Sequence, residues 1–113
     1  MFDMIQALFN RDSDGNLVSF EVTGHAESGP EGSDIVCAAV SALTFGATNS
    51  IEALAGFQPL VDMDDAVNGG HLYVEILQDI TGEQFHIAQI LLESLRLSIQ
   101  GITEEYPEYV KMN

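Results

Sequence analysis

Residues 17–23 read LVSFEVT, and this stretch decides the first half of the fold. Apolar and polar side chains alternate along it, with Val18, Phe20 and Val22 on one side, which is typical of a β-strand with one buried face. The preceding apolar stretch, residues 4–9, predicts a second strand. The chain is therefore expected to open on two adjacent strands.

The segment between these two strands, residues 12–16, reads DSDGN and predicts a hairpin turn. Its Gly and Asn residues accept the positive φ that tight turns require. A calcium loop is the alternative, because the segment is rich in carboxylates. A calcium loop of the EF-hand type beginning at Asp12 would need Gly at its sixth position and Glu at its twelfth, where the sequence has Leu17 and Thr23. This mismatch favours the turn.

Residues 24–33, GHAESGPEGS, contain three glycines and one proline and predict a loop. Ser33 or Asp34 then has the side-chain oxygen of a helix N-cap, and the predicted helix runs to about Ala55. This helix carries many small residues, which let another element approach its backbone closely: Ala38, Ala39, Ser41, Ala42, Gly46 and Ala47.

The second half of the chain repeats the order of the first. Residues 57–63 and 71–77 predict two strands joined by a turn at 64–70, and apolar residues at helical spacing predict a helix from Gly82 to about Thr103. The expected fold is an α/β (α+β) two-layer domain of order ββαββα, with a small mixed four-stranded sheet and two long helices. Residues 1–113 are expected to form one domain.

The charge of the chain restricts its partners. Eighteen acidic residues and three basic ones give a formal net charge of -15, which repels nucleic acid and anionic lipid, so neither is expected as a partner. No apolar run of about 18 residues is apparent, and the chain does not begin with the basic segment of a signal peptide, so we expect no membrane segment. The protein is expected in the reducing cytoplasm.

Cys37 is the only cysteine, so no internal disulfide can form. The three histidines and Cys37 do not have zinc-ligand spacing, and no metal or cofactor is expected. Cys37 lies near the start of the first predicted helix, where backbone N–H groups favour a thiolate. His25 lies twelve residues earlier on a glycine-rich loop that can bring its imidazole to the sulfur, as base and nucleophile. From spacing alone, a buried unreactive cysteine and an ordinary loop histidine remain the alternative.

A resemblance strengthens the catalytic interpretation. Residues 24–26, GHA, and residues 32–41, GSDIVCAAVS, resemble the signature of the ribosomal-processing cysteine proteases called Prp. The length, the ββαββα order and the segment EEYPEY at 104–109 are also similar to that family. The resemblance implies Cys37 as the nucleophile and His25 as the general base.

The same resemblance implies roles for two further positions. Asp34 matches an acidic position of the family and would orient His25, although it is equally suited to be the helix N-cap. Ser41 matches a serine one turn beyond the nucleophile, but a serine within a helix often only bonds a carbonyl of the preceding turn. Backbone N–H groups around Val36 and Cys37 are candidates for an oxyanion hole.

The glycines around His25 suggest a substrate loop. Gly24, Gly29 and Gly32 lower the energy of the backbone changes that closing over an extended peptide would need. The two other histidines, His71 and His86, read as ordinary structural or surface residues, and we assign them no role.

The resemblance implies an endopeptidase that removes a short N-terminal extension from the precursor of large-subunit ribosomal protein twenty-seven, and it suggests a homodimer. The acidity of the chain would attract such a basic precursor, although acidity can also serve solubility alone. The alternative from another class is a non-catalytic ribosome-assembly or dimerisation module.

Overall fold

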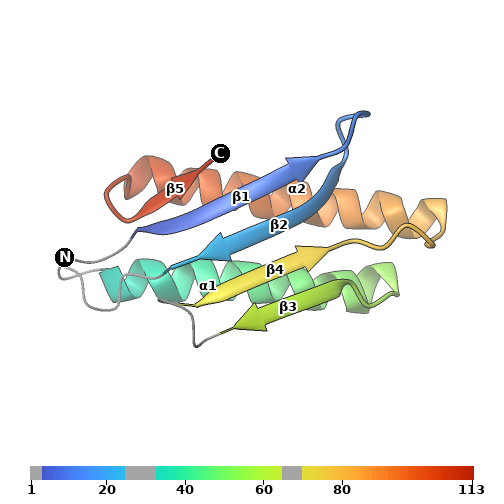
Figure 1. Cartoon of the computed structure of the whole chain (residues 1–113), viewed down its shortest axis with the longest axis horizontal. Coiled ribbons are helices and arrows are strands. Elements are labelled where there is room, and N and C mark those ends of the chain that lie inside the picture. The colour runs from blue at the N-terminus through green and yellow to red at the C-terminus, as the bar shows by residue number, and fades with distance from the viewer. Residues whose placement is uncertain (1–3, 25–32, 65–69) are drawn as a thin grey trace.

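The computed structural model describes residues 4–24, 33–64 and 70–113, together with all their side chains except those of Ser33 and Asp34. The elements follow in the order β1 (Ile5–Arg11), β2 (Leu17–Thr23), α1 (Ser33–Ser50), η1 (Ile51–Ala55), β3 (Leu60–Asp64), β4 (His71–Glu75), α2 (Gly82–Glu105) and β5 (Val110–Met112). Both long helices lie behind one face of the sheet (Figure 1). The predicted two-layer α+β class is confirmed.

The sheet has five strands in the order β3-β4-β2-β1-β5, one more than predicted. All pairings are antiparallel except that of β1 with β5, so the sheet is mixed, as expected. The missed strand, β5, has only three residues, too few for an alternation pattern. It is fixed by distant contacts: Ile5 is in register with Val110, and the Asn113 side chain bonds both backbone groups of Phe9, at 2.8 and 2.9 Å.

The first hairpin forms as predicted, and its turn uses the Asp12 carboxylate. Oδ1 of Asp12 accepts hydrogen bonds from the backbone N–H groups of Asp14 and Asn16, at 2.9 and 3.0 Å. These bonds, chiefly that from Asn16, lower the pKa of Asp12. One detail of the predicted strand is wrong: Asn10 pairs with Ser19 and Arg11 with Leu17, so the register shifts at Val18. Leu17 is consequently fully buried, whereas Val18 is only half-buried.

The first helix changes its winding before it ends. α1 ends at Ser50, and the remainder of the predicted helix forms the π-helix η1, closed by a bond from the Gly56 N–H to the Ile51 carbonyl. The core side of the two elements is made by Val36, Val40, Thr44, Ile51 and Ala55. Residues 35–55 are long and apolar enough to cross a membrane, by length and composition alone. The sequence-based statement that no such run exists was therefore too strong, although a core helix can have the same length and composition.

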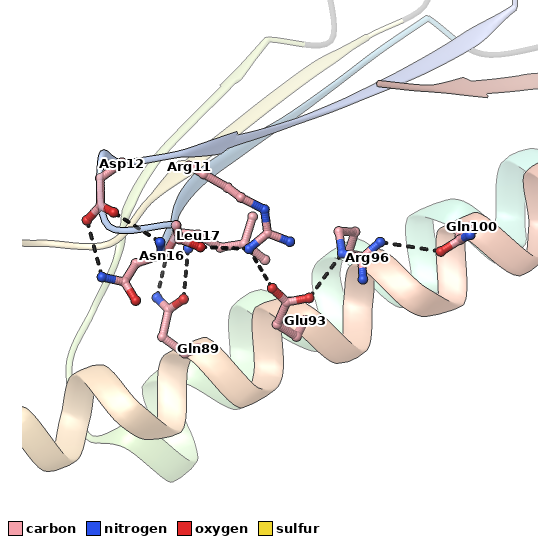
Figure 2. Close-up of polar contacts among 9 residues, drawn as sticks. Arg11, Asp12, Asn16, Leu17, Gln89, Glu93, Arg96 and Gln100 are labelled. Atoms are coloured by element: carbon pink, nitrogen blue, oxygen red, sulfur yellow. Dashed lines mark hydrogen bonds and ion pairs between the residues drawn. The ribbon is translucent and has the colours of Figure 1, made fainter.

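The helix α2 begins and ends close to its predicted bounds. The Thr81 hydroxyl accepts from the Gln84 N–H while the Gln84 side chain accepts from the Thr81 N–H, which forms a capping box. Further along, the Gln89 side chain bonds both the N–H and the carbonyl of Leu17, at 2.8 and 2.6 Å (Figure 2). This pair of bonds attaches the middle of α2 to the start of β2.

The second hairpin is shorter than predicted. β3 begins at Leu60 rather than 57, directly after Pro59, and β4 ends at Glu75 rather than 77. Most of the predicted turn at 64–70 lies outside the described residues. The second hairpin forms one side of the sheet, beside β2.

Candidate active site

The C-terminal ends of β2 and β3, the N-terminal end of β4 and the start of α1 gather at one end of the molecule (Figure 1). A cleft of about 260 Å³ opens there between α1 and the sheet. Its described lining residues come from five elements and from the segments next to them: Ile5, Val22, Gly24, Cys37, Val40, Ser41, Thr44, Phe45, Met63, Gly70, His71 and Leu72. Most of these side chains are apolar, so the cleft suits apolar parts of a ligand.

Cys37 lies in this cleft, four residues after the start of α1 at Ser33. It is half-buried, and it packs against the core while remaining accessible from the cleft. The first turns of a helix favour negative charge, because their N–H groups point toward its N-terminus. A cysteine in this position has the surroundings in which thiolates act as nucleophiles.

Ser41 also lines the cleft, one helical turn beyond Cys37 and on the same side of α1, as the spacing predicts. Thr44 follows on that side and is almost fully buried. Its hydroxyl donates to the Val40 carbonyl at 2.9 Å and also lies 3.2 Å from that of Ser41. Thr44 therefore has its hydrogen bond within the helix, and Ser41 is the nearer hydroxyl to Cys37 along α1.

Gly24 is the last described residue before His25, and its backbone is held closely. Its N–H donates to the Gly70 carbonyl at 3.1 Å. Its φ is +76°, and a Cβ atom at this position would lie 2.7 Å from the Met4 carbonyl oxygen. The residue that directly precedes His25 is thus held in a fixed position at the rim of the Cys37 cleft.

The remaining predicted site residues lie outside what the structure describes. These are His25, Gly29, Gly32 and the side chain of Asp34. The pairing of His25 with Cys37, the choice between orienting and capping roles for Asp34, and the closing of the loop therefore stay predictions.

His71 lies closer to the site than the sequence suggested. It lines the cleft that contains Cys37, and its Nε2 is 2.6 Å from Oε2 of Glu21 on the neighbouring strand. Its alternation with Tyr73 places it on a strand face but does not show which strand pairs with β4. His71 reaches the cleft because β4 pairs with β2, with Thr23 opposite His71, and the sequence alone does not show this pairing.

Two apolar side chains of the cleft were also missed. Phe45 of α1 and Met63 of β3 are both about half exposed and line the cleft from different elements. His86 lies elsewhere, exposed on α2, as expected of a surface residue. Within residues 4–24, 33–64 and 70–113, no three His, Cys, Asp or Glu side chains group as metal ligands.

Comparison with known proteins identifies the family of this chain. Residues 4–111 match the family model described as cysteine protease Prp. The chain is 39% identical to the ribosomal processing cysteine protease Prp of Bacillus subtilis over 109 residues, which are 96% of each protein. It is 36% identical to the protein of that name from Staphylococcus aureus over 110 residues, 97% of this chain and 98% of the relative.

Solved structures agree with this assignment. The crystal structure of SMU.848 from Streptococcus mutans matches with a TM-score of 0.86 and 41% identity, over 98% of this chain and 93% of the other. The ribosomal processing protease Prp from S. aureus, in complex with a substrate peptide, matches with a TM-score of 0.83 and 33% identity, over 97% and 98%. These similarities favour an enzyme over the alternative of a non-catalytic module. The chain belongs to the cysteine protease Prp family and is a cysteine peptidase.

Proposed function

We propose that this peptidase removes a short N-terminal extension from the precursor of large-subunit ribosomal protein twenty-seven. The observation that carries the proposal is the placement of the accessible Cys37 in a largely apolar cleft at the start of a helix. The names of the B. subtilis and S. aureus relatives, which describe ribosomal processing, support the class of substrate. The substrate peptide in the S. aureus complex supports a peptide segment as the ligand.

In the proposed mechanism, the Cys37 thiolate attacks the carbonyl carbon of the scissile peptide bond. His25 donates a proton to the leaving amine, and a thioester forms between Cys37 and the N-terminal fragment. Water, deprotonated by His25, then hydrolyses the thioester and restores the thiolate. Backbone N–H groups around Val36 and Cys37 would stabilise the oxyanion. No cofactor or metal takes part.

Asp34 and Ser41 have supporting roles in this proposal. Asp34 would hold the His25 ring in the productive orientation, and Ser41, next to Cys37 on the cleft side of α1, would bond the substrate. Gly24, Gly29 and Gly32 would let the loop close over the bound segment.

Incubation with the precursor, followed by mass spectrometry, tests the proposal. Cys37→Ala should abolish cleavage, and His25→Ala should lower kcat/KM by at least about 1000-fold. His86→Ala is the matched control, because His86 lies exposed on α2, and this variant should cleave at the rate of the unchanged protein. Cleavage of the precursor by Cys37→Ala at a comparable rate would disprove the mechanism.

Alkylation by iodoacetamide gives an independent test that needs no substrate. A nucleophilic cysteine should react as a thiolate well below the ordinary cysteine pKa of about 8.5. Its rate of modification should therefore stay high when the pH is lowered toward neutrality. A rate that follows an ordinary thiol would count against Cys37 as the nucleophile.

The apolar lining of the cleft indicates what the substrate presents to it. Phe45 of α1 and Met63 of β3 line the cleft together with Val22 of β2 and Leu72 of β4. We propose that apolar residues before the cut occupy this space. Changing them one at a time to Ser in a short peptide should lower kcat/KM, whereas unchanged rates for every peptide would contradict an apolar subsite.

We also propose a cytoplasmic homodimer that binds neither nucleic acid nor membrane. Ile90 and Leu97 are 57% and 58% exposed on one side of α2 and offer an apolar contact. Glu93 between them is bonded by Arg11 and Arg96, two of only three basic residues in the chain, so two copies would repel each other least here. Leu97→Glu should convert a dimer to a monomer in light scattering, and an unchanged mass would disprove this interface.

A further inference from the structure

One face of the sheet is covered by neither α1 nor α2, the two long helices of the described residues (Figure 1). On β2, β4 and β3 the register aligns the side chains in two sets of rows. The rows that contain the buried Phe20, Leu72 and Val74 point toward the helices. Because neighbouring residues of a strand point to opposite faces, the other rows point away from the helices. They consist of Ser19, Glu21, Thr23, Leu60, Asp62, Asp64, His71, Tyr73 and Glu75, which we call the acidic face.

The acidic face carries four carboxylates and no lysine or arginine. Glu21, Asp62, Asp64 and Glu75 lie on three adjacent strands, and the one basic group among them is His71, bonded to Glu21. The three Lys and Arg residues of the chain lie elsewhere. Arg11 and Arg96 bond Glu93 of α2. Lys111 is in register with Gln6 and thus on the same side of the sheet as Thr23, but it lies on β5, at the opposite edge and two strands away from β2. The face is therefore strongly negative with no strong cation of its own.

The acidic face is continuous with the active-site cleft. His71 lines the cleft and is also bonded to Glu21 of the acidic face. On β3, Met63 lines the cleft, and its neighbours Asp62 and Asp64 are on the acidic face. The cleft and the acidic face therefore meet at His71 and at Met63 with its neighbours on β3.

The far end of the acidic face is hollowed. A cavity of about 600 Å³ is lined by Ser19, Tyr73 and Glu75 of the face and by Asp12 and Phe85 nearby, among other residues. The Tyr73 hydroxyl donates to Glu75 at 2.5 Å, and this bond is the main reason that the pKa of Tyr73 is raised. Carboxylates beside an aromatic ring are a suitable environment for a guanidinium or ammonium group.

We propose that the acidic face is the docking surface for the arginine- and lysine-rich body of the protein substrate, beyond the segment that enters the cleft. This inference rests on the proposed function. A second copy of this chain would bring like charges together on this face, and nucleic acid or an anionic membrane would be repelled. A basic polypeptide is the partner whose charge complements it.

Two variants of equal charge test the inference. The face variant combines Asp62→Asn, Asp64→Asn and Glu75→Gln, none of which lines the Cys37 cleft. The control variant combines Glu104→Gln, Glu105→Gln and Glu108→Gln, which are exposed and lie outside the face. Each removes three negative charges, so a difference between them reports position rather than net charge. The substrates are the full-length precursor and an uncharged peptide spanning the cut.

The face variant should lower kcat/KM for the precursor about tenfold at low salt, mainly through KM, and should weaken its dependence on salt. Its kcat/KM for the uncharged peptide should be unchanged, and the control variant should stay within about twofold on both substrates. Equal losses in both variants, or no loss in either, would overturn the inference. A loss on the uncharged peptide would do so too, since the substitutions would then act through the cleft.

Binding separates this inference from the proposed function. Cys37→Ala binds without cutting, so calorimetry can compare its affinity for the precursor with and without the three face substitutions. Weaker binding with those substitutions supports the docking surface even if the unchanged enzyme fails to cut the precursor, a failure that would refute only the proposed function. Equal affinities would overturn the docking surface. Light scattering tests whether a second copy of the chain occupies the acidic face instead. A change of molecular mass in the face variant but not in the control variant would identify such a copy, and it would overturn the inference.

Discussion

At the scale of single residues, Gly24 connects the sheet to the segment that carries His25. Its positive φ and its proximity to the Met4 carbonyl oxygen are two separate reasons why no side chain fits there. Gly15, in the first hairpin turn, has a similar φ of +85° but nothing within 4 Å of a Cβ atom. Comparing the stability effects of substitutions at these two glycines therefore separates the cost of the backbone conformation from the cost of a steric clash.

We expect Gly24→Ala to destabilise the fold by more than Gly15→Ala. A left-handed conformation costs an alanine about 1 kcal/mol, which is the expected loss for Gly15→Ala. Gly24→Ala adds a contact with backbone and should lose about 2–4 kcal/mol. Urea unfolding of both variants measures the difference, and equal losses would show that β1 moves away from Gly24 without strain.

At the scale of elements, β1, the first turn and α2 are joined by polar side chains (Figure 2). Gln89 bonds both backbone groups of Leu17, and Arg11 connects the Gly15 carbonyl, at 2.8 Å, to Glu93, at 2.7 Å. Leu17 is fully buried, so loss of its partner leaves backbone groups that water reaches poorly. Glu93 is more than a third exposed, so its bonds are weaker than their short distances suggest.

Gln89→Ala should therefore lower the free energy of unfolding by about 2–3 kcal/mol, because two backbone groups of β2 lose their partner. Gln100→Ala is the control, since the Gln100 side chain accepts a long bond of 3.3 Å from the partly exposed Arg96, and the Thr103 bond to the Gln100 backbone carbonyl is kept in the variant. It should change stability by less than about 0.5 kcal/mol. Similar small losses in both variants, measured by urea unfolding, would mean that water replaces Gln89 at Leu17.

The Glu93 ion pairs should make stability depend on pH. Hydrogen bonding from Arg11, and to a lesser degree from Arg96, lowers the pKa of Glu93 below its ordinary 4.5. A lowered pKa stabilises the fold above the unfolded value, and this gain is lost as the pH falls through the folded value. The advantage of the unchanged protein over Glu93→Gln should thus be about 1 kcal/mol or less near neutrality, shrink as the pH falls below 4.5, and vanish once Glu93 is protonated in the folded state as well. Unfolding of both proteins in urea across that range tests this, and a gap that widens in acid would contradict it.

Elements that depend on local patterns could be predicted from the sequence, whereas features that depend on strand pairing could not. The alternation of Phe20 and Val22 and the helical spacing in α2 are local signals, and both elements formed as predicted. The shift at Val18, by contrast, depends on how β1 pairs with β2, and β5 exists only because β1 offers it an edge.

The residues of the candidate site also differ in how far the sequence predicts their positions. Cys37 and Ser41 lie on one helix and were predicted together, whereas His71 and Met63 reach the cleft through pairings between strands. Such pairings are tertiary contacts, and neighbouring residues in the sequence do not reveal them.

At the scale of the whole molecule, a charge of -15 is spread over a body of 45 × 28 × 24 Å. The Debye length is about 30 Å at 0.01 M salt and about 8 Å at 0.15 M. At low salt, carboxylates on opposite sides of the molecule therefore still repel each other, whereas at physiological salt mainly neighbours do. This repulsion opposes the compact state.

Added salt should stabilise the fold. We expect the Tm to rise by several degrees when NaCl is increased from about 0.01 M to about 0.15 M, by screening of this repulsion. The variant with Glu104, Glu105 and Glu108 changed to glutamine should show a smaller rise, because it has fewer charges to screen. A Tm that falls with salt would mean that attractive ion pairs, such as those of Glu93, outweigh the repulsion.

The parallel pairing of β1 with β5 has a consequence for how the chain is made. Ile5 and Val110 are neighbours in the sheet although nearly the whole chain separates them. During synthesis the β1–β2 hairpin can form early, but the outer edge of β1 stays unpaired until β5, made after every other described element, has emerged. An unpaired edge can recruit strands from other nascent chains. Long-range closure of this kind is also slow, so the sheet is completed only after β5 has been made and not in step with the synthesis of β1 and β2.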